Sequence, residues 1–307
     1  MSRPDGFLVD AVCIGETMLL LVPDPPQPPE RAETFRRDIG GAESNVAIHL
    51  SRLGRQVVWH SALGDDAFGR YVRSRVAAEG VDCSEVRFEP DHPTGLYVKE
   101  FGEAGTTVVY YRRGSAACTL GPADLHAVWA RRPRLVHTTG ITAAISEPGH
   151  ALVAGLLDDA PAGVLRSFDV NYRPRLHAHG GSDTLRDLAG RADIVFCGVD
   201  EANALWGAST VDEVWRLLGP DGTLVVKQGS DGATVFQAGR RWHLPAPQVD
   251  VVEPVGAGDA FAAGVLHGVL DSAGWPECLA RGNRLAAEVL QVHGDLPPDE
   301  ARATHVG

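Results

Sequence analysis

The sequence predicts a three-layer α/β/α fold around a mostly parallel sheet. Apolar runs of strand length alternate with segments of helical periodicity along most of the chain, which is typical of a parallel sheet with helices on both faces. The length of 307 residues is enough for one large domain with a substantial core. Two segments interrupt the alternation, and they predict a small second β-sheet within the same domain.

The strands expected in the main sheet are short, apolar and bounded by turn residues. In chain order they are residues 8–15, 57–64, 134–140, 164–171, 192–198 and 223–229. The helices expected between them include residues 42–53, 69–80 and 122–132. In the first of these helices Ala42, Val46 and Leu50 recur on one face, and Gly54 ends the pattern.

The two interrupting segments do not resemble strand–helix units. Residues 17–38 contain PDPPQPPE, with five prolines in eight positions, which predicts an exposed extended loop. Residues 92–114 hold two β-rich runs around GEAG and predict a hairpin. Together we expect a small antiparallel sheet that acts as a lid, or a surface hairpin without a role. Its exposed face could pair with another copy in a homodimer or higher homo-oligomer.

Composition limits the partners of the protein. The net charge of −12 argues against a nucleic-acid partner, although a nucleotide can still bind at a local site with Mg²⁺. The five cysteines are scattered, without a CxxC pair, which is typical of free thiols in a reducing cytoplasm. We expect no membrane partner, because no stretch is long and apolar enough to cross a bilayer.

The segment VVEPVGAGDAFAAGVLHGVL (251–270) carries the clearest chemistry. It begins with a strand-like apolar pair, turns through Gly256, Ala257 and Gly258, and enters a helix. Amides at such a turn could hold a phosphoryl group, and Asp259 could accept the proton of the attacking hydroxyl. An ordinary N-cap aspartate is the alternative. The P-loop signature GxxxxGK[ST] is absent from the sequence.

Four segments resemble the ribokinase-like (PfkB) carbohydrate kinases. GAGDAFAAG (256–264) resembles the family's C-terminal signature, and GGAESNVAIHLSRLG (40–54) resembles its N-terminal signature. ALGDDAFG (62–69) and VVKQGSDGA (225–233) also match family segments. The resemblance runs from about residue 11 to residue 295, and it implies a ribokinase-like fold and an ATP- and Mg²⁺-dependent kinase.

The resemblance also implies roles for individual residues. Asp259 would be the catalytic base, the amides of Gly256, Ala257 and Gly258 the anion hole, and Glu201 a magnesium contact through water. The residues implied for ATP are Asn171, Arg173, Lys227, Gly229, Gly232, Gly256, Gly258 and Asn283. Taken alone, the turn at 227–232 could be a plain surface turn, and Asn283 a solvent-facing side chain.

Arginines predict the class of acceptor. Arg112 lies at the return of the hairpin and Arg173 just past a strand, and an arginine is a natural bidentate partner of a carboxylate. Unless both are ordinary surface arginines, they favour a sugar acid over a neutral hexose. The same segments resemble the 2-keto-3-deoxygluconate kinases. The residues implied for the substrate are Gly40, Gly41, Asn45, Tyr97, Tyr110, Arg112, Arg173, Asp259 and Asp295. Fructose and 5-dehydro-2-deoxygluconate are the alternative acceptors.

Two departures from the family pattern bear on metal ions. Glu253, Pro254 and Val255 stand where the family often has Asp-Thr-Thr, which leaves roles in magnesium or monovalent-cation binding open. Gly198 replaces the asparagine of an Asn-x-x-Glu motif whose Glu201 is retained. Both departures would also fit a non-catalytic sugar-acid sensor, but the intact Gly-Ala-Gly-Asp argues against one.

Overall fold

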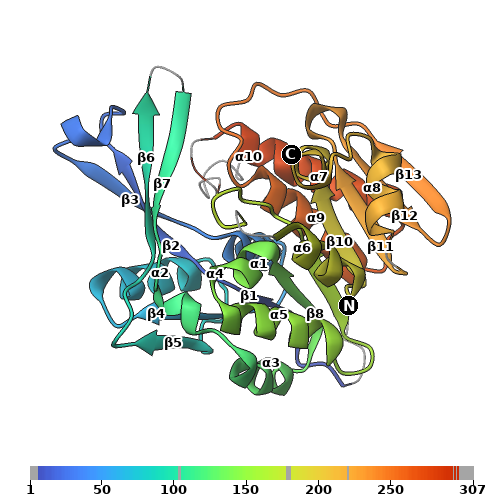
Figure 1. The fold of residues 1–307 in the computed structure, drawn as a ribbon, viewed down its shortest axis with the longest axis horizontal. Helices are drawn as coiled ribbons and strands as arrows, with labels where there is room; N and C mark the ends of the chain where they lie inside the picture. Colours follow the sequence, from blue (N-terminus) through green and yellow to red (C-terminus); the bar gives the residue numbers. More distant parts are fainter. Residues whose placement is uncertain are drawn as a thin grey trace.

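A nine-stranded sheet forms the centre of the computed structural model, which describes residues 6–102, 105–177, 181–219, 221–292, 294 and 296 (Figure 1). Its strand order is β13-β12-β11-β10-β9-β8-β1-β4-β5. The strands are β1 (Val9–Ile14), β4 (Val57–Gly64), β5 (Val86–Glu89), β8 (Pro133–Thr139), β9 (Leu165–Asp169), β10 (Ile194–Gly198), β11 (Thr223–Lys227), β12 (Ala233–Gln237) and β13 (Arg240–Leu244). Only the β11–β12 and β12–β13 pairs in this order are antiparallel. The expected mostly parallel sheet is confirmed, with all six strands that the sequence predicts.

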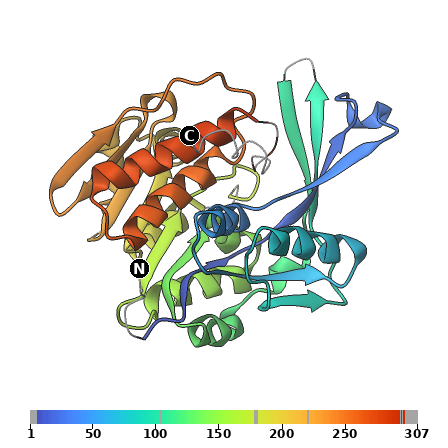
Figure 2. The same ribbon diagram turned by 180° about the vertical axis from the view of Figure 1, so that it is seen from behind.

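Helices cover both faces of this sheet, which confirms the three layers. One face carries α1 (Ala42–Arg52), α2 (Ala67–Ala78), α9 (Ala257–Leu270) and α10 (Trp275–Leu290) (Figure 2). The other carries α3 (Leu125–Ala130), α5 (Glu147–Asp158), α6 (Gly181–Gly190), α7 (Val199–Trp206) and α8 (Val211–Leu218) (Figure 1). Successive strand residues enter opposite layers: in β10, Phe196 packs with α9 and Cys197 with the α7–α8 side.

The loops of the described chain contain shorter helical segments. They are α4 (Gly140–Ile145) and the 3₁₀ turns η1 (Pro29–Arg31), η2 (Ala116–Thr119), η3 (Pro122–Asp124) and η4 (Gly229–Asp231). No helix in the described part of the chain combines the length and the apolar character needed to cross a membrane.

A second, four-stranded sheet stands away from the main body (Figure 1). It consists of β2 (Met18–Pro23), β3 (Phe35–Gly40), β6 (Leu96–Gly102) and β7 (Gly105–Tyr111), in the order β3-β2-β6-β7. The predicted hairpin is confirmed as β6 and β7. The expectation of a wholly antiparallel sheet is wrong, because β2 and β6 pair in parallel. β2 forms a hairpin with β3, and β6 forms a hairpin with β7. The two hairpins join through the parallel β2–β6 pair.

Two local predictions are also corrected. The proline-rich segment is not extended throughout, because Pro29–Arg31 forms a 3₁₀ turn; proline's fixed φ suits the first residues of such a turn. The apolar pair Val251 and Val252 is not a strand but an exposed loop. The Val252 amide donates to the Leu290 carbonyl at the end of α10, and not to a neighbouring strand.

Candidate active site

A cleft of about 710 Å³ lies where the small sheet meets the carboxyl ends of the main strands. Its walls include Glu16 after β1, Asn171 after β9, Glu201 after β10 and Lys227 at the end of β11. Open α/β sheets place ligand sites at this edge, because loops from several parallel strands converge there. The cleft brings together these sequence-predicted residues: Gly40, Gly41, Asn45, Tyr97, Tyr110, Arg112, Asn171, Arg173, Glu201, Lys227, Gly256, Gly258 and Asp259.

The glycine loop begins α9 as the sequence suggests. Gly256 is the N-cap and has a φ of 81°, in the left-handed region that favours glycine. Asp259 is the third residue of the helix, so the N-cap alternative for this aspartate is wrong. The first-turn amides of a helix have no partner within the helix and carry a partial positive charge. The loop therefore presents amide donors to the cleft, with a carboxylate in the same turn.

The two family-like signatures meet at Asp259. The Asn45 side-chain amide donates a hydrogen bond of 2.9 Å to the Asp259 Oδ2 atom, across 214 residues of sequence. Asn45 is 2% exposed and lies in the first turns of α1, where Gly41 is the N-cap. This bond fixes the direction of the carboxylate. Asn45 was predicted as a sugar contact, and its bond to Asp259 could not be foreseen from the pattern.

Steric crowding explains the glycine at position 41. A Cβ atom there would lie 2.3 Å from the Glu16 carbonyl oxygen and 2.7 Å from the Thr17 hydroxyl. Because its φ of −173° is ordinary extended backbone, the constraint is space rather than conformation. Any side chain at this position would push the start of α1 away from the segment that leads into β2.

Lys227 lies in a cluster of charges at the ends of three neighbouring strands. Its ammonium is 2.8 Å and 3.0 Å from the two Asp169 oxygens and 3.9 Å from a Glu201 oxygen. Burial alone would lower the pKa of Lys227, but the Asp169 and Glu201 carboxylates outweigh burial and raise it. The cleft therefore contains a permanently charged ammonium, and Asp169 is a functional candidate that sequence reasoning missed.

Glu201 holds backbone amides as well as facing the cleft. One carboxylate oxygen accepts from the Gly198 amide at 2.7 Å, and the other from the Tyr172 amide at 2.9 Å. The first bond closes a capping box at the start of α7, and it needs only a backbone N–H at position 198. The described residues contain no group of three or more His, Cys, Asp or Glu side chains arranged for a metal. A carboxylate at the cleft wall fits Mg²⁺ that brings its own phosphate and water ligands.

Arg112 is held by a carboxylate that the sequence analysis did not assign. Its guanidinium forms an ion pair with Glu16, whose side chain is 2% exposed. Ser115 donates to the other Glu16 oxygen at 2.5 Å. The position of Glu16 in the sequence could have indicated this role, because Glu16 is a polar residue just after an apolar strand, at the edge of the sheet where ligands bind.

Two predicted tyrosines form a platform beside Arg112. Tyr97 and Tyr110 are opposite each other on β6 and β7, with ring centroids 5.6 Å apart. The Arg112 guanidinium lies 5.9 Å from the Tyr110 ring centroid. Aromatic faces next to donors are well suited to the apolar faces and hydroxyls of a sugar.

The segment after β9 carries the second predicted arginine. Arg173 is exposed and donates to the Tyr172 carbonyl at 2.9 Å, and Arg175, which was not predicted, also lines the cleft. Asn171 adopts a φ of 42° and is 4% exposed, and its side-chain oxygen has no partner in the described part of the chain. A buried acceptor without a partner at a cleft wall is a candidate ligand contact.

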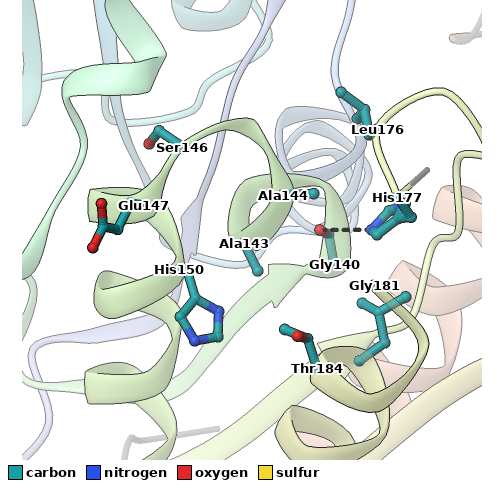
Figure 3. Close-up of a pocket in the computed structure, with 11 residues that line it drawn as sticks. Gly140, Ala143, Ala144, Ser146, Glu147, His150, Leu176, His177, Gly181 and Thr184 are labelled. Atoms are coloured by element: carbon teal, nitrogen blue, oxygen red, sulfur yellow. Dashed lines mark hydrogen bonds between the residues drawn. The ribbon is translucent and has the colours of Figure 1, made fainter. Parts of the chain in front are cut away.

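His177 anchors this segment. Its Nδ1 atom lies 2.9 Å from the Arg173 carbonyl oxygen. Its Nε2 atom lies 3.3 Å from the Gly140 carbonyl oxygen, a contact that Figure 3 shows at the edge of a neighbouring pocket. That pocket has a volume of about 400 Å³ and lies between α4, α5 and α6. His177 thus ties the arginine-bearing segment to the start of α4.

Among the described residues, Gly229, Gly232, Ala257 and Asn283 were predicted for the site but do not line the cleft. Gly229 and Gly232 have positive φ values of 59° and 96° in the turn after β11. Asn283 is buried in α10 and donates to the Pro245 carbonyl at 3.0 Å, so the solvent-facing alternative for it is wrong. Ala257 is the first residue of α9. Asp295 lies outside the described residues.

A buried glutamate, Glu43, lies at the start of α1 and was read only as part of a helix. It is fully buried, and one of its oxygens accepts from the Thr139 and Thr142 hydroxyls at 2.7 Å and 2.6 Å. Burial raises the pKa of Glu43, and the hydrogen bonds from Thr142 and Thr139 only partly offset this effect. The side chain joins the helix that carries Asn45 to the start of α4.

We expect Glu43 to make stability depend on pH. The folded-state pKa of Glu43 is raised above the ordinary value of 4.5. The stability that the protonated side chain contributes to the fold is therefore fully present below pH 4.5, and it is lost as pH rises through the folded-state pKa. Each unit of difference corresponds to about 1.4 kcal/mol. Glu43→Gln cannot ionise, so its free energy of unfolding should gain on the wild type as pH rises. Urea denaturation over a pH series checks this, and a difference that stays constant with pH would contradict it.

Comparison with known proteins agrees with the resemblance found in the two signatures. Residues 9–302 match the pattern of the pfkB family carbohydrate kinases. The chain is 36% identical over 296 residues to 2-dehydro-3-deoxygluconokinase of Bacillus subtilis, covering 94% of this chain and 91% of the relative. The crystal structure of a PfkB protein from Polaromonas is 40% identical, with a TM-score of 0.85 and coverage of 96% and 99% of the two chains. Aminoimidazole riboside kinase from Salmonella enterica, solved with aminoimidazole riboside and an ATP analogue, is 27% identical, with a TM-score of 0.80 and coverage of 96% and 99%.

Proposed function

Because the chain belongs to the pfkB family of carbohydrate kinases, we propose that it transfers the γ-phosphoryl group of ATP to 2-keto-3-deoxygluconate and forms the 6-phosphate. The observation that carries the proposal is the composition of one cleft. It holds Asp259 beside the amides of the glycine loop, and it also holds Arg112 and Arg173. The name of the Bacillus subtilis relative supports the same acceptor.

In this proposal Asp259 and the glycine loop carry out the transfer. The primary hydroxyl of the sugar attacks the γ-phosphorus in line, its proton passes to an Asp259 oxygen, and the bond to the ADP oxygen breaks. Amides of Gly256 and Gly258 stabilise the charge that develops on the transferred group. Asn45 keeps the carboxylate pointed at the hydroxyl through its 2.9 Å hydrogen bond.

The charges around Lys227 suit the phosphates. The Lys227 ammonium lines the cleft while Asp169 fixes its position. Mg²⁺, when bound, would neutralise phosphate charge, and Glu201 would hold it through water. Asn171 and Arg173 both line the cleft and would reach the phosphates or the acceptor.

The acceptor assignment depends on the arginines. Glu16 already balances the charge of Arg112, whereas no carboxylate contact is recorded for Arg173 in the described part of the chain. An exposed, unbalanced guanidinium at the cleft attracts an anion, and the carboxylate of a sugar acid can take a bidentate position on it. A neutral hexose would gain nothing comparable.

We expect Arg173→Leu to raise KM for 2-keto-3-deoxygluconate by about 10- to 100-fold, because a hydrogen-bonded ion pair contributes about 1.5–3 kcal/mol. The use of a neutral sugar such as fructose should change far less. Steady-state kinetics with a coupled ADP-release assay measures both. Arg216→Leu, an exposed arginine on α8 outside the cleft, is the matched control.

The same assay tests the acceptor directly. A panel of 2-keto-3-deoxygluconate, 5-dehydro-2-deoxygluconate and fructose should give the highest kcat/KM for the first. A preference for fructose, or equal losses on acidic and neutral sugars in Arg173→Leu, would refute the carboxylate argument. Activity on any of the three would leave the family assignment intact.

A further inference from the structure

An ion pair joins the small sheet to the segment that leads into the glycine loop. Lys99 lies on β6, its side chain is 6% exposed, and its ammonium pairs with the Glu253 carboxylate. The other Glu253 oxygen accepts from the Gly294 amide at 2.9 Å. Glu253 is three residues before the N-cap of α9. One carboxylate therefore connects the small sheet, the approach to the glycine loop and the turn after α10.

Lys99 points toward the cleft rather than toward solvent. Along β6 the side chains alternate, so that Tyr97 and Lys99 are buried while Val98 and Glu100 are partly exposed. Both Tyr97 and Lys99 line the cleft. The Lys99–Glu253 ion pair thus lies between the small sheet and residues 245–256. The lid-like sheet and the phosphate-binding loop are thus connected at the site itself.

The choice of lysine is unusual for this chain. Of its 28 lysine and arginine residues, only Lys99 and Lys227 are lysines. Both line the cleft, and both ammonium groups are paired with carboxylates. Arginine is longer, planar and held in a fixed fork, whereas lysine is a compact point charge. At both positions where the chain uses lysine, a compact ammonium in the cleft thus pairs with a carboxylate from another segment.

Stability alone is a weak explanation for such a pair. Removing two charges from water costs much of what their attraction returns, so a buried ion pair is often no more stabilising than two apolar residues. A pair placed between the small sheet and the glycine loop can instead fix their relative position. Catalytic rates are sensitive to displacements of about 1 Å in such positions.

We propose that Lys99 is a positioning residue, whose ion pair with Glu253 fastens the small sheet over the cleft and sets the approach of the glycine loop. Closure of the sheet and placement of the Gly256 and Gly258 amides then occur together. When the pair is made, the sugar hydroxyl is the nucleophile within reach of the γ-phosphorus. When it is broken, water enters and converts ATP to ADP and phosphate. The inference depends on carbohydrate kinase activity and not on the identity of the acceptor.

The test is a double-mutant cycle with Lys99→Met and Glu253→Gln. Sugar phosphate and ADP are measured in the same reaction, with whichever sugar the acceptor panel identifies. Each single variant should lower kcat/KM for the acceptor by about 5- to 100-fold, and the double variant should lose little more than either one. Each should also release more ADP than sugar phosphate. Losses that multiply, or an ADP to product ratio that stays at one, would overturn the proposal.

Controls separate positioning from folding. Glu100→Gln is the matched variant on the same strand, outside the cleft lining, and should keep normal kinetics and a one-to-one ratio. Lys99→Arg keeps the charge but should not restore normal coupling. If a single variant fails to fold, Lys99→Met with Glu253→Met leaves no unpaired charge behind and should remain folded. That variant should still release more ADP than sugar phosphate, and full, tightly coupled transfer in it would overturn the proposal.

Discussion

Asp259→Asn should lower kcat for phosphoryl transfer by about 10²- to 10⁴-fold, the usual effect of removing a general base. The amide cannot accept the proton of the sugar hydroxyl, although it has nearly the same shape as the carboxylate. Its oxygen can still accept the hydrogen bond from Asn45, which in the wild type joins α1 to α9 at 2.9 Å. We therefore expect the thermal midpoint and the affinity for ATP to change much less than kcat.

Steady-state kinetics with the preferred acceptor, together with calorimetric ATP binding, checks this expectation. Asp183→Asn makes the same chemical change on an exposed residue of α6, outside the cleft, and should leave kcat unchanged. Near-normal turnover in Asp259→Asn would remove Asp259 from the role of base. A loss of activity accompanied by unfolding would show a structural role instead.

Lys227→Met should destabilise the fold by about 3–5 kcal/mol, because it leaves a buried carboxylate without its counter-charge. The Asp169 side chain is 2% exposed and accepts from the Lys227 ammonium through both oxygens. Adding Asp169→Asn removes the orphaned charge, so the double variant should recover a large part of the loss. Urea denaturation of the single and double variants measures both effects.

The expected pH dependence of this pair follows from the raised pKa of Lys227. A lysine whose folded-state pKa is raised contributes stability that is fully present below its unfolded value of 10.5 and is lost only as pH rises through the higher folded-state value. The difference between wild type and Lys227→Met should therefore stay constant from about pH 7 to pH 10.5 and should fall above that range. A cost under about 1 kcal/mol, the value typical of an exposed pair, would contradict the buried arrangement.

Periodicity in the sequence was enough to predict the main sheet, because a buried parallel strand needs an apolar run such as residues 57–64 regardless of its neighbours. Pairing in the small sheet was not predictable in the same way. The hairpin of β6 and β7 is local and was found, whereas the parallel β2–β6 pair joins distant segments. Val251 and Val252 illustrate the converse error, since β-forming residues without a partner strand remain loop.

The residues around the cleft were easier to predict than their contacts. The sequence alone shows a glycine bend before a helix and polar residues after strands. These features led to Asp259, Asn171 and Lys227. Which charges meet depends on the three-dimensional arrangement of segments. For that reason Glu16 beside Arg112, and Lys99 beside Glu253, could not be paired from the sequence. The roles assigned to the cleft residues in catalysis remain predictions for the experiments above.

The hydrogen bond between Asn45 and Asp259 has a consequence for the order in which function arises during synthesis. Asn45 leaves the ribosome 214 residues before Asp259, whose carboxylate it orients. N-terminal segments generally fold as they emerge, so much of the sheet can form before α9 exists. A nascent chain without α9 would then contain Asn45 but not Asp259, and we expect it to lack kinase activity until α9 has been synthesised.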